Sequence, residues 1–442
     1  MRAWKLGAVS LFLSACSGGG ETTPTTTPSD GPGKAQKAQV TPPVEPPKPV
    51  QDKIEGEPRP ALLLAQAWFW KDENKKSNPG PARLEIWRQG DDGKWGFTRL
   101  EDGDSNVFHK ALPFRGGVLT IGAEGAHLKF WTLTDGEWSG RSLWQNEWGG
   151  KFNRLRDLEV GDVDGDGADE IVFVTHDAGV VAVAEVEGDG ADFEVKVTEM
   201  DQKVDTFVHE IEIGDIDGDG KNEFFCTPSD RNKANASQAG GVAMYKHTGG
   251  GKYARTWVDN QEGTHAKEIL VYDVDGDGTD ELYGVMEGEK DPVNKKKLKK
   301  PVQIVHYTQK GDGSFERKVV AEVKNEAQTR FLVPGDFDYD GKIELMALAM
   351  KTGIHFIDPG ETGDDGMWKV TTIATKSSGF EHAAYAADLD DDGKIELYVA
   401  ADEQHELRSY RYNAESKKFD SELLGKMTEK SLFTWNLTVG EL

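Results

Sequence analysis

The sequence has 442 residues, which is long enough to bury a large core, and its formal net charge is −26. A phosphate backbone would repel so acidic a chain, which excludes nucleic acid as its main partner. Twelve tryptophans indicate a globular fold, and two cysteines are too few for a disulfide framework.

The first residues have the pattern of an export signal. Arg2 and Lys5 give a positive start, and the apolar run that follows at 6–13 is too short to span a membrane. The run ends in Leu-Ser-Ala-Cys, which resembles the lipobox of bacterial lipoproteins. The resemblance implies a signal peptide over 1–15, lipidation of Cys16 and a membrane anchor in the bacterial cell envelope, with the outer membrane or cell surface favoured. An ordinary signal peptide with an incidental Cys16 is the alternative.

Residues 16–57 are rich in proline, threonine and glycine and have no hydrophobic period, so we expect an extended tether. The globular part is predicted over 58–442. Cys226 lies there in a strand-like run, where we expect it to act as a small buried hydrophobe.

A nine-residue acidic motif occurs five times in the globular part, at 162–170, 215–223, 273–281, 336–344 and 388–396. Each copy has carboxylates at positions 1, 3, 5 and 9 and glycine at position 6. Oxygen ligands on a loop that turns sharply at a glycine suit Ca²⁺. The side chain at position 7 varies, as expected if this residue offers only its backbone carbonyl. The motif predicts about five bound Ca²⁺ ions.

An EF-hand loop also begins D-x-D-x-D-G, but it ends with a glutamate at position 12 and lies between two helices. Here the last acid stands at position 9, and the flanking runs, such as IEIGD and EFFCT, are short, apolar and strand-like. The pattern excludes an EF-hand.

The first aspartates of the five copies are 53, 58, 63 and 52 residues apart. A period near 50 residues that contains about four strands is typical of propeller blades. Two more blades without the acidic motif fit upstream. The first of these lacks an innermost strand, which the C-terminal run LFTWNLTVGEL can supply. The sequence predicts an all-β, seven-bladed propeller closed by its C-terminal strand, with eight blades or an open array as the alternative.

The copies GDVDGDGADEIVFV and GDIDGDGKNEFF resemble the FG-GAP/VCBS repeats of integrin α-subunit propellers and of many bacterial surface proteins. The resemblance implies Ca²⁺ in the hairpin between the first and second strands of a blade. Carried over by position, the implied ligands are Asp162, Asp164, Asp166, Ala168 and Glu170; Asp215, Asp217, Asp219, Lys221 and Glu223; Asp273, Asp275, Asp277, Thr279 and Glu281; Asp336, Asp338, Asp340, Lys342 and Glu344; and Asp388, Asp390, Asp392, Lys394 and Glu396.

We expect this metal to be structural. Four carboxylates repel one another without a cation, and a ligand that binds only the native state adds about 2.7 kcal/mol per site at a hundredfold excess over Kd. Extracellular modules commonly bind Ca²⁺ with submillimolar to millimolar affinity, which suits permanent occupancy.

Seven further residues are predicted to ring the central funnel at the end opposite the acidic loops, namely His109, Arg156, His209, Lys267, Arg330, His382 and Trp435. They form a candidate site for an acidic or carbohydrate ligand. Alternatively, they pair with neighbouring acids such as Asp157, Glu210 and Glu268 and lock adjacent blades. Lysines on the long loops, at 71–76 and 290–300, are expected on the same end, where they could steer an anionic partner or simply be solvated.

No nucleophile elbow, phosphate loop or zinc motif occurs in the sequence. We therefore expect a monomeric, lipid-anchored binding or adhesion module for a glycan or an envelope or extracellular protein, and not an enzyme. A polysaccharide-cleaving lyase or hydrolase that uses the funnel, or an envelope assembly scaffold, are the alternatives.

Overall fold

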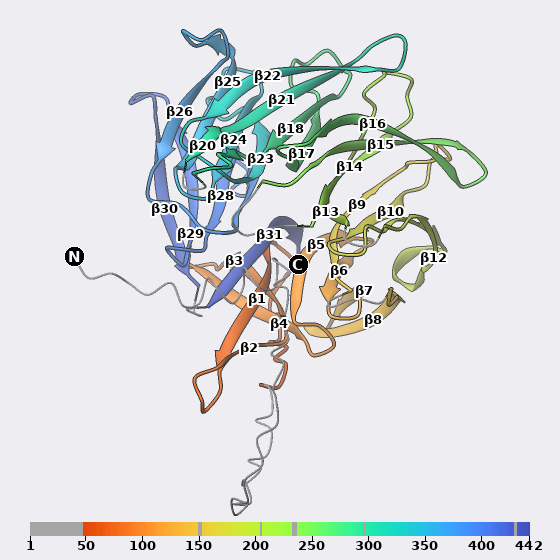
Figure 1. Cartoon of the computed structure of the whole chain (residues 1–442). Helices are drawn as coiled ribbons and strands as arrows, with labels where there is room; N and C mark the ends of the chain where they lie inside the picture. Colours follow the sequence, from red (N-terminus) through yellow and green to blue (C-terminus); the bar gives the residue numbers. More distant parts are fainter. Residues whose placement is uncertain (1–46, 149–152, 204–205, 232–236, 295–296, 428–430) are drawn as a thin grey trace, which may run out of the picture.

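The computed structural model describes residues 47–148, 153–203, 206–231, 237–294, 297–427 and 431–442. These residues form seven antiparallel sheets of four main strands each, arranged around a common centre (Figure 1). The seven-bladed propeller is confirmed. Within the described ranges the only helical element is the 3-10 turn η1 (Gly190–Asp192), and none is long and apolar enough to cross a membrane.

The blades are numbered here in chain order, and each is given from its innermost to its outermost strand. Blade 1 is β31 (Leu432–Glu441), β1 (Pro60–Lys71), β3 (Ala82–Gln89) and β4 (Trp95–Asp102). Blade 2 is β5 (Val107–Phe114), β6 (Gly117–Ala123), β7 (His127–Thr134) and β8 (Glu137–Gln145). Blade 3 is β9 (Leu155–Gly161), β10 (Glu170–Thr175), β11 (Val181–Glu187) and β12 (Glu194–Asp201). Blade 4 is β13 (Thr206–Gly214), β14 (Glu223–Asp230), β15 (Gly240–Gly249) and β16 (Lys252–Gln261).

The last three blades have the same order of strands. Blade 5 is β17 (Ala266–Tyr272), β18 (Glu281–Met286), β21 (Val302–Gln309) and β22 (Phe315–Val323). Blade 6 is β23 (Thr329–Gly335), β24 (Glu344–Ala349), β25 (Gly353–Thr362) and β26 (Trp368–Ala374). Blade 7 is β27 (His382–Ala387), β28 (Glu396–Ala401), β29 (Glu406–Asn413) and β30 (Lys418–Lys426).

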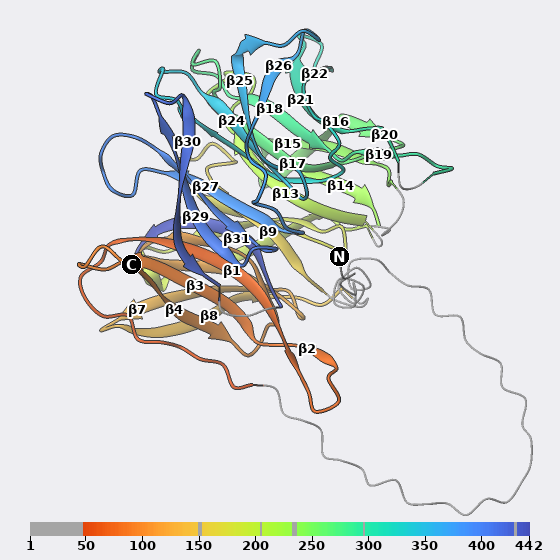
Figure 2. The same cartoon turned by 90° about the vertical axis from the view of Figure 1, so that its left-hand side faces the viewer.

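Two short ribbons extend from this ring. The first is the end of β1 paired with β2 (Ser77–Pro79), and the second pairs β19 (Glu289–Lys290) with β20 (Leu298–Lys300) (Figure 2). Both follow the second strand of a blade. They therefore project from the end of the ring at which the innermost strands begin.

The ring closes through the two ends of the globular part. As predicted from the sequence, the C-terminal strand β31 completes blade 1. It pairs with β1 in an antiparallel register that brings Leu62 opposite Val439. The C-terminus lies beside this pair in Figure 1. The Thr438 hydroxyl also donates a hydrogen bond of 2.7 Å to the Ala111 carbonyl of blade 2. Closure thus depends on strand pairing and side-chain packing between segments at opposite ends of the chain.

The core lies between neighbouring blades. Strands of alternating or continuous apolar residues face one another there, and their buried side chains form clusters that extend across blade boundaries. Between blades 2 and 3, for example, the Phe193 ring lies 4.9 Å from Phe130 and 5.2 Å from Phe114, measured between ring centroids. Cys226 is fully buried in one of these clusters, and burial raises the pKa of its thiol to about 12. It is the small buried hydrophobe that the sequence predicted.

The last residues of the predicted tether contact the propeller, whereas we expected an extended tether up to residue 57. Residues 50–54 lie on the propeller, where Gln51 bridges to Leu100, Asp52 pairs with Arg99 at 2.9 Å, and Ile54 is buried. The sequence pattern missed this contact because five residues are too few to show a strand period. Cys16 and the rest of the signal and tether up to residue 46 lie outside the described residues.

Candidate metal sites and the axial funnel

The five acidic loops occupy equivalent places in blades 3 to 7. Each connects the innermost strand of its blade to the second strand, as the family resemblance implied. Because the innermost strands all run in the same direction, the loops share one end of the ring. We call them the blade 3, 4, 5, 6 and 7 loops, which correspond to 162–170, 215–223, 273–281, 336–344 and 388–396.

The structure brings three or four of the predicted carboxylates of each loop together. In the blade 5 and blade 6 loops all four acids offer an oxygen within 4.8 Å of the others. In the blade 3, 4 and 7 loops the acids at positions 1, 3 and 9 do so, and position 5 lies outside the group. These groups are Asp273, Asp275, Asp277 and Glu281; Asp336, Asp338, Asp340 and Glu344; Asp162, Asp164 and Glu170; Asp215, Asp217 and Glu223; and Asp388, Asp390 and Glu396.

The aspartate at position 1 organises the backbone of each loop. In the blade 5 loop, Asp273 accepts hydrogen bonds from the amides of Gly276 at 2.7 Å and Gly278 at 2.9 Å. Gly278, at position 6, has φ of +91°, a conformation in which a residue with a Cβ is strained. The invariable glycine at position 6 is therefore explained by the turn that folds the loop back on its first carboxylate.

The backbone at position 7 makes the same hydrogen bond in all five loops. In each copy its backbone amide donates to the aspartate at position 5, for example Ala168 to Asp166 at 2.8 Å and Thr279 to Asp277 at 2.9 Å. The other members are Lys221, Lys342 and Lys394. This hydrogen bond holds the backbone of position 7 against the aspartate at position 5 in all five loops.

The glutamate at position 9 begins the second strand, and it is buried in the blade 3, 4, 6 and 7 loops and half-buried in the blade 5 loop. Burial, together with the neighbouring aspartates, raises the pKa of Glu344 to about 8 and the pKa of Glu170 and Glu281 to about 7. Asp336 Oδ1 is buried and has no hydrogen-bond partner within the described part of the chain. Crowded carboxylates and an unpartnered buried oxygen fit a hard divalent cation, which would offset their repulsion.

Neighbouring loops are tied to one another through position 8. The Asn222 side chain of the blade 4 loop donates to the Asp162 carbonyl of the blade 3 loop at 2.9 Å. In the same way, Asp280 of the blade 5 loop accepts from the backbone amide of Asp215 at 3.0 Å. The order of one loop is therefore coupled to the order of the next.

The predicted funnel residues lie at the opposite end of the ring and only partly converge. His109, Arg156, Lys267, Arg330 and Trp435 line one central cavity, together with the acids Asp157, Glu210 and Glu381. The volume of this cavity is about 10 Å³, which is room for about one water molecule. His382 does not line it, and instead contacts Ser377 and the Ala349 carbonyl.

Basic and acidic groups of the funnel contact one another. Arg330 lies 3.6 Å from Glu381, and the Arg156 guanidinium lies 5.2 Å from the centre of the Trp435 ring. Lys267 Nζ lies 3.1 Å from His209 Nε2, and burial with nearby Arg330 lowers the Lys267 pKa to about 7. The funnel residues thus contact one another across blade boundaries, which is the arrangement expected if they lock adjacent blades.

A group of acids extends from the funnel cavity, which Asp157 and Glu210 line, along the innermost strands. Five carboxylates, from Asp157, Glu159, Glu210, Glu212 and Glu268, interact along the innermost strands β9, β13 and β17, with Lys110 as the cation beside them. Burial and mutual repulsion raise the pKa of Glu210, Glu212 and Glu268 well above the usual value. Three of these acids, Asp157, Glu210 and Glu268, were predicted only as pairing partners of the funnel residues. Acids two residues apart on one strand, such as Asp157 and Glu159, point to the same face, and this spacing could have predicted the group from the sequence.

Comparison with known proteins agrees with this architecture. Residues 215–284 match the family model described as FG-GAP-like repeat, which covers the blade 4 loop through to the second strand of blade 5. The chain is a seven-bladed β-propeller, and this part of it is similar to the FG-GAP-like repeat. No curated protein sequence matches the chain.

Several solved structures share the fold at low sequence identity. A protein from Lactobacillus plantarum has a TM-score of 0.54 and 11% identity, covering 86% of this chain and 100% of its own. The cobalt-substituted apocarotenoid oxygenase of Synechocystis has a TM-score of 0.52 and 11% sequence identity, and the match covers 90% of this chain and 97% of the oxygenase. A candidate 6-phosphogluconolactonase from Bacteroides fragilis has a TM-score of 0.50 and 12% sequence identity, and the match covers 86% of this chain and 98% of the lactonase. At such identities the likeness shows a propeller and carries no activity over to this chain.

Proposed function

We propose that this protein is a calcium-stabilised binding module of the bacterial cell envelope, anchored through a lipid on Cys16, which binds a glycan or an envelope or extracellular protein. The observation that carries the proposal is the gathering of three or four carboxylates in each of five equivalent loops at one end of the ring. Oxygen-only donor sets of this kind suit Ca²⁺.

The metal's role in this proposal is structural. Each loop joins the two inner strands of its blade, and Asn222 and Asp280 tie neighbouring loops together. A divalent cation would cancel the repulsion among the buried acids and so stabilise both the blade and its contact with the next blade. The chain's own carboxylates would hold the ion, and in four of the five loops the glutamate at position 9 is the buried member, namely Glu170, Glu223, Glu344 and Glu396.

The end of the ring opposite the acidic loops is our candidate binding face. The two ribbons project there, and they carry described lysines at positions 71, 75, 76, 290, 297, 299 and 300. Lys299 pairs with Glu289 at 2.6 Å, whereas Lys75 and Lys76 are exposed in the turn of the first ribbon. Basic ribbons on one end of so acidic a chain favour an anionic partner, such as an acidic glycan.

The size of the funnel favours binding over catalysis. A polysaccharide-cleaving enzyme needs a groove that admits a sugar, and the cavity between Arg156, Lys267 and Glu381 has about 10 Å³. The basic side chains that line it already contact protein partners. The enzyme alternative therefore requires the funnel to open, which a binding face on the ribbons does not.

The experiment applies the full chain to arrays of polyuronates and sulfated glycans, once in Ca²⁺ and once in EGTA, and recovers co-purified envelope proteins under both conditions. Retention of one glycan class or one protein partner in Ca²⁺ and its loss in EGTA is the expected result. Binding that ignores Ca²⁺ would contradict the proposal. Time-dependent cleavage of a glycan, abolished in an Arg156→Ala variant, would favour the enzyme instead.

The anchor is tested separately in bacterial membranes. A Cys16→Ser variant is expected to move from the membrane fraction to the soluble fraction, whereas Cys226→Ser is expected to stay with the membrane. Equal membrane association of all three proteins would contradict lipidation at Cys16.

A further inference from the structure

In each of blades 3 to 7, one residue on the third strand lies beside the position 9 glutamate of the acidic loop. In blade 4, Phe224 pairs with Tyr245, which places the next residue, Lys246, beside Glu223. In blade 7, Leu397 pairs with Tyr410, which places Arg411 beside Glu396. We call this the facing position.

The facing residue of blade 4 enters the group of acids. Lys246 Nζ lies 2.5 Å from Asp217 Oδ2, 2.9 Å from Asp219 Oδ2 and 2.6 Å from Glu223 Oε1. These are the acids at positions 3, 5 and 9 of the loop. An ammonium group therefore contacts three of the four carboxylates that are predicted to bind a metal ion there.

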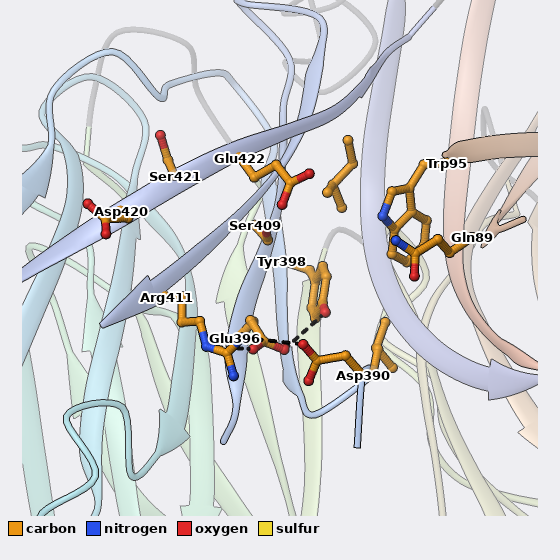
Figure 3. Close-up of a pocket in the computed structure, with 12 residues that line it drawn as sticks. Gln89, Trp95, Asp390, Glu396, Tyr398, Ser409, Arg411, Asp420, Ser421 and Glu422 are labelled. Atoms are coloured by element: carbon orange, nitrogen blue, oxygen red, sulfur yellow. Dashed lines mark hydrogen bonds and ion pairs between the residues drawn. The ribbon is translucent and has the colours of Figure 1, made fainter. Parts of the chain in front are cut away.

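The facing residue of blade 7 makes the same three contacts with a guanidinium group. Arg411 Nη1 lies 3.3 Å from Asp390, its Nε lies 3.3 Å from Glu396, and Nη2 contacts Asp392. Figure 3 shows Arg411, Glu396 and Asp390 pointing toward one another in a pocket of about 270 Å³, with Trp95 of blade 1 across from them. A planar fork of five donors matches several carboxylates at once.

The other three loops have no cation at this place. The pairs Ile171–Ala184, Leu282–Tyr307 and Leu345–Ile357 put Glu185, Thr308 and Asp358 at the facing position of blades 3, 5 and 6. In these three loops the position 9 glutamate accepts a hydrogen bond from the backbone amide at position 2, at 3.0, 2.7 and 3.0 Å in blades 3, 5 and 6. The two loops in which all four acids converge, those of blades 5 and 6, are both in this class.

We propose that Lys246 and Arg411 are internal counter-cations that hold the blade 4 and blade 7 loops closed without a metal ion, so that the five loops form two classes. The inference builds on the proposed function, since it concerns the affinity of the same loops. Loops 3, 5 and 6 bind Ca²⁺ tightly. Loops 4 and 7 bind it more weakly, because the ion and the side-chain cation compete for the same three carboxylates and repel each other.

The test measures Ca²⁺ binding to the full chain by equilibrium dialysis and titration calorimetry. We expect three tight sites and two sites at least tenfold weaker. Thr is the natural facing residue of blade 5, so Lys246→Thr and Arg411→Thr should each convert one weak site into a tight one. Thr308→Lys should do the reverse. Lys252→Thr, an exposed lysine at the start of β16, is the matched control and should change nothing.

A second measurement does not depend on bound metal. In EGTA, Lys246→Thr and Arg411→Thr should lower the melting temperature relative to Lys252→Thr, whereas in saturating Ca²⁺ the difference should disappear. Five equal sites in the natural protein, or facing-position variants with unchanged site classes, would overturn this inference alone. A natural protein that takes up no Ca²⁺ would overturn the proposed function, and this inference with it.

Discussion

The Asn222 side chain donates a hydrogen bond of 2.9 Å to the backbone carbonyl of Asp162, which joins the acidic loops of two neighbouring blades. The bond crosses the boundary between blades 3 and 4 at the acidic loops. We therefore expect the conformation of one loop to stabilise that of the other. The sequence alone shows only that position 8 varies among Asp169, Asn222, Asp280, Ile343 and Ile395.

Loss of this bond should weaken the boundary between blades 3 and 4. We expect Asn222→Ala to lower the free energy of unfolding by about 1 kcal/mol, the usual net worth of one hydrogen bond. Ca²⁺ binding at the blade 3 loop should weaken as well. Chemical denaturation measures the first effect and calorimetric titration the second. Asp364→Ala, at an exposed loop residue, serves as the control, and equal behaviour of the two variants would contradict the coupling.

Backbone strain is expected at position 6 of the acidic loops. Gly278 has φ of +91° and no heavy atom within 4 Å of a built Cβ, so Gly278→Ala isolates the conformational cost. We expect a loss of about 1–2 kcal/mol. Gly96, in strand β4, also has open space but ordinary backbone angles, and Gly96→Ala should be neutral or slightly stabilising. A Gly278→Ala variant as stable as Gly96→Ala would show that the loop does not need this turn.

The axial carboxylates predict how stability depends on pH. The folded-state pKa of Glu210 and Glu268 is raised, first by burial and then by neighbouring acids, so the folded protein retains protons that the unfolded chain releases. Stability should therefore fall as pH rises from about 4.5, the ordinary glutamate value. In excess Ca²⁺, Glu210→Gln and Glu268→Gln should flatten this slope and raise stability at pH 8. The exposed Glu262→Gln should leave the slope unchanged, and identical slopes for all three would contradict the assignment.

Ring closure makes the C-terminal strand necessary for cooperative folding. Strand β31 buries Leu432, Trp435 and Leu437, and its loss would leave the long β1 strand as an unpaired edge. A chain that ends at residue 427 should lose its single sharp thermal transition and aggregate. A synthetic peptide of residues 431–442, but not a scrambled one, should restore the transition in a calorimetric scan. Unchanged melting of the shortened chain would show that closure contributes nothing.

Much of the fold could be predicted from the sequence because the propeller repeats itself. The five acidic motifs fixed the positions of five hairpins, and the likeness of LFTWNLTVGEL to an innermost strand fixed the closure. The carboxylate sets followed from spacing within one short loop. Local patterns of this kind survive in a sequence because they depend on residues only a few places apart.

The features that the sequence did not predict depend on register between distant segments. Lys246 lies 23 residues after Glu223, and only the pairing of Phe224 with Tyr245 brings the two together. The contact of residues 50–54 with blade 1 likewise involves Arg99, far along the chain. Alignment predicted that seven residues ring the funnel, of which five line one cavity, and their side-chain partners and the small size of that cavity come from packing.

The most direct test of the account is the melting temperature of the full chain in Ca²⁺ and after exhaustive dialysis against EGTA, with the calcium content of the folded protein measured alongside. Three tight sites at about 2.7 kcal/mol each predict at least three Ca²⁺ ions per chain and a fall of about 10 °C or more on chelation. A melting temperature that chelation leaves unchanged, or folded protein without stoichiometric calcium, would contradict the claim that metal ions hold these blades together.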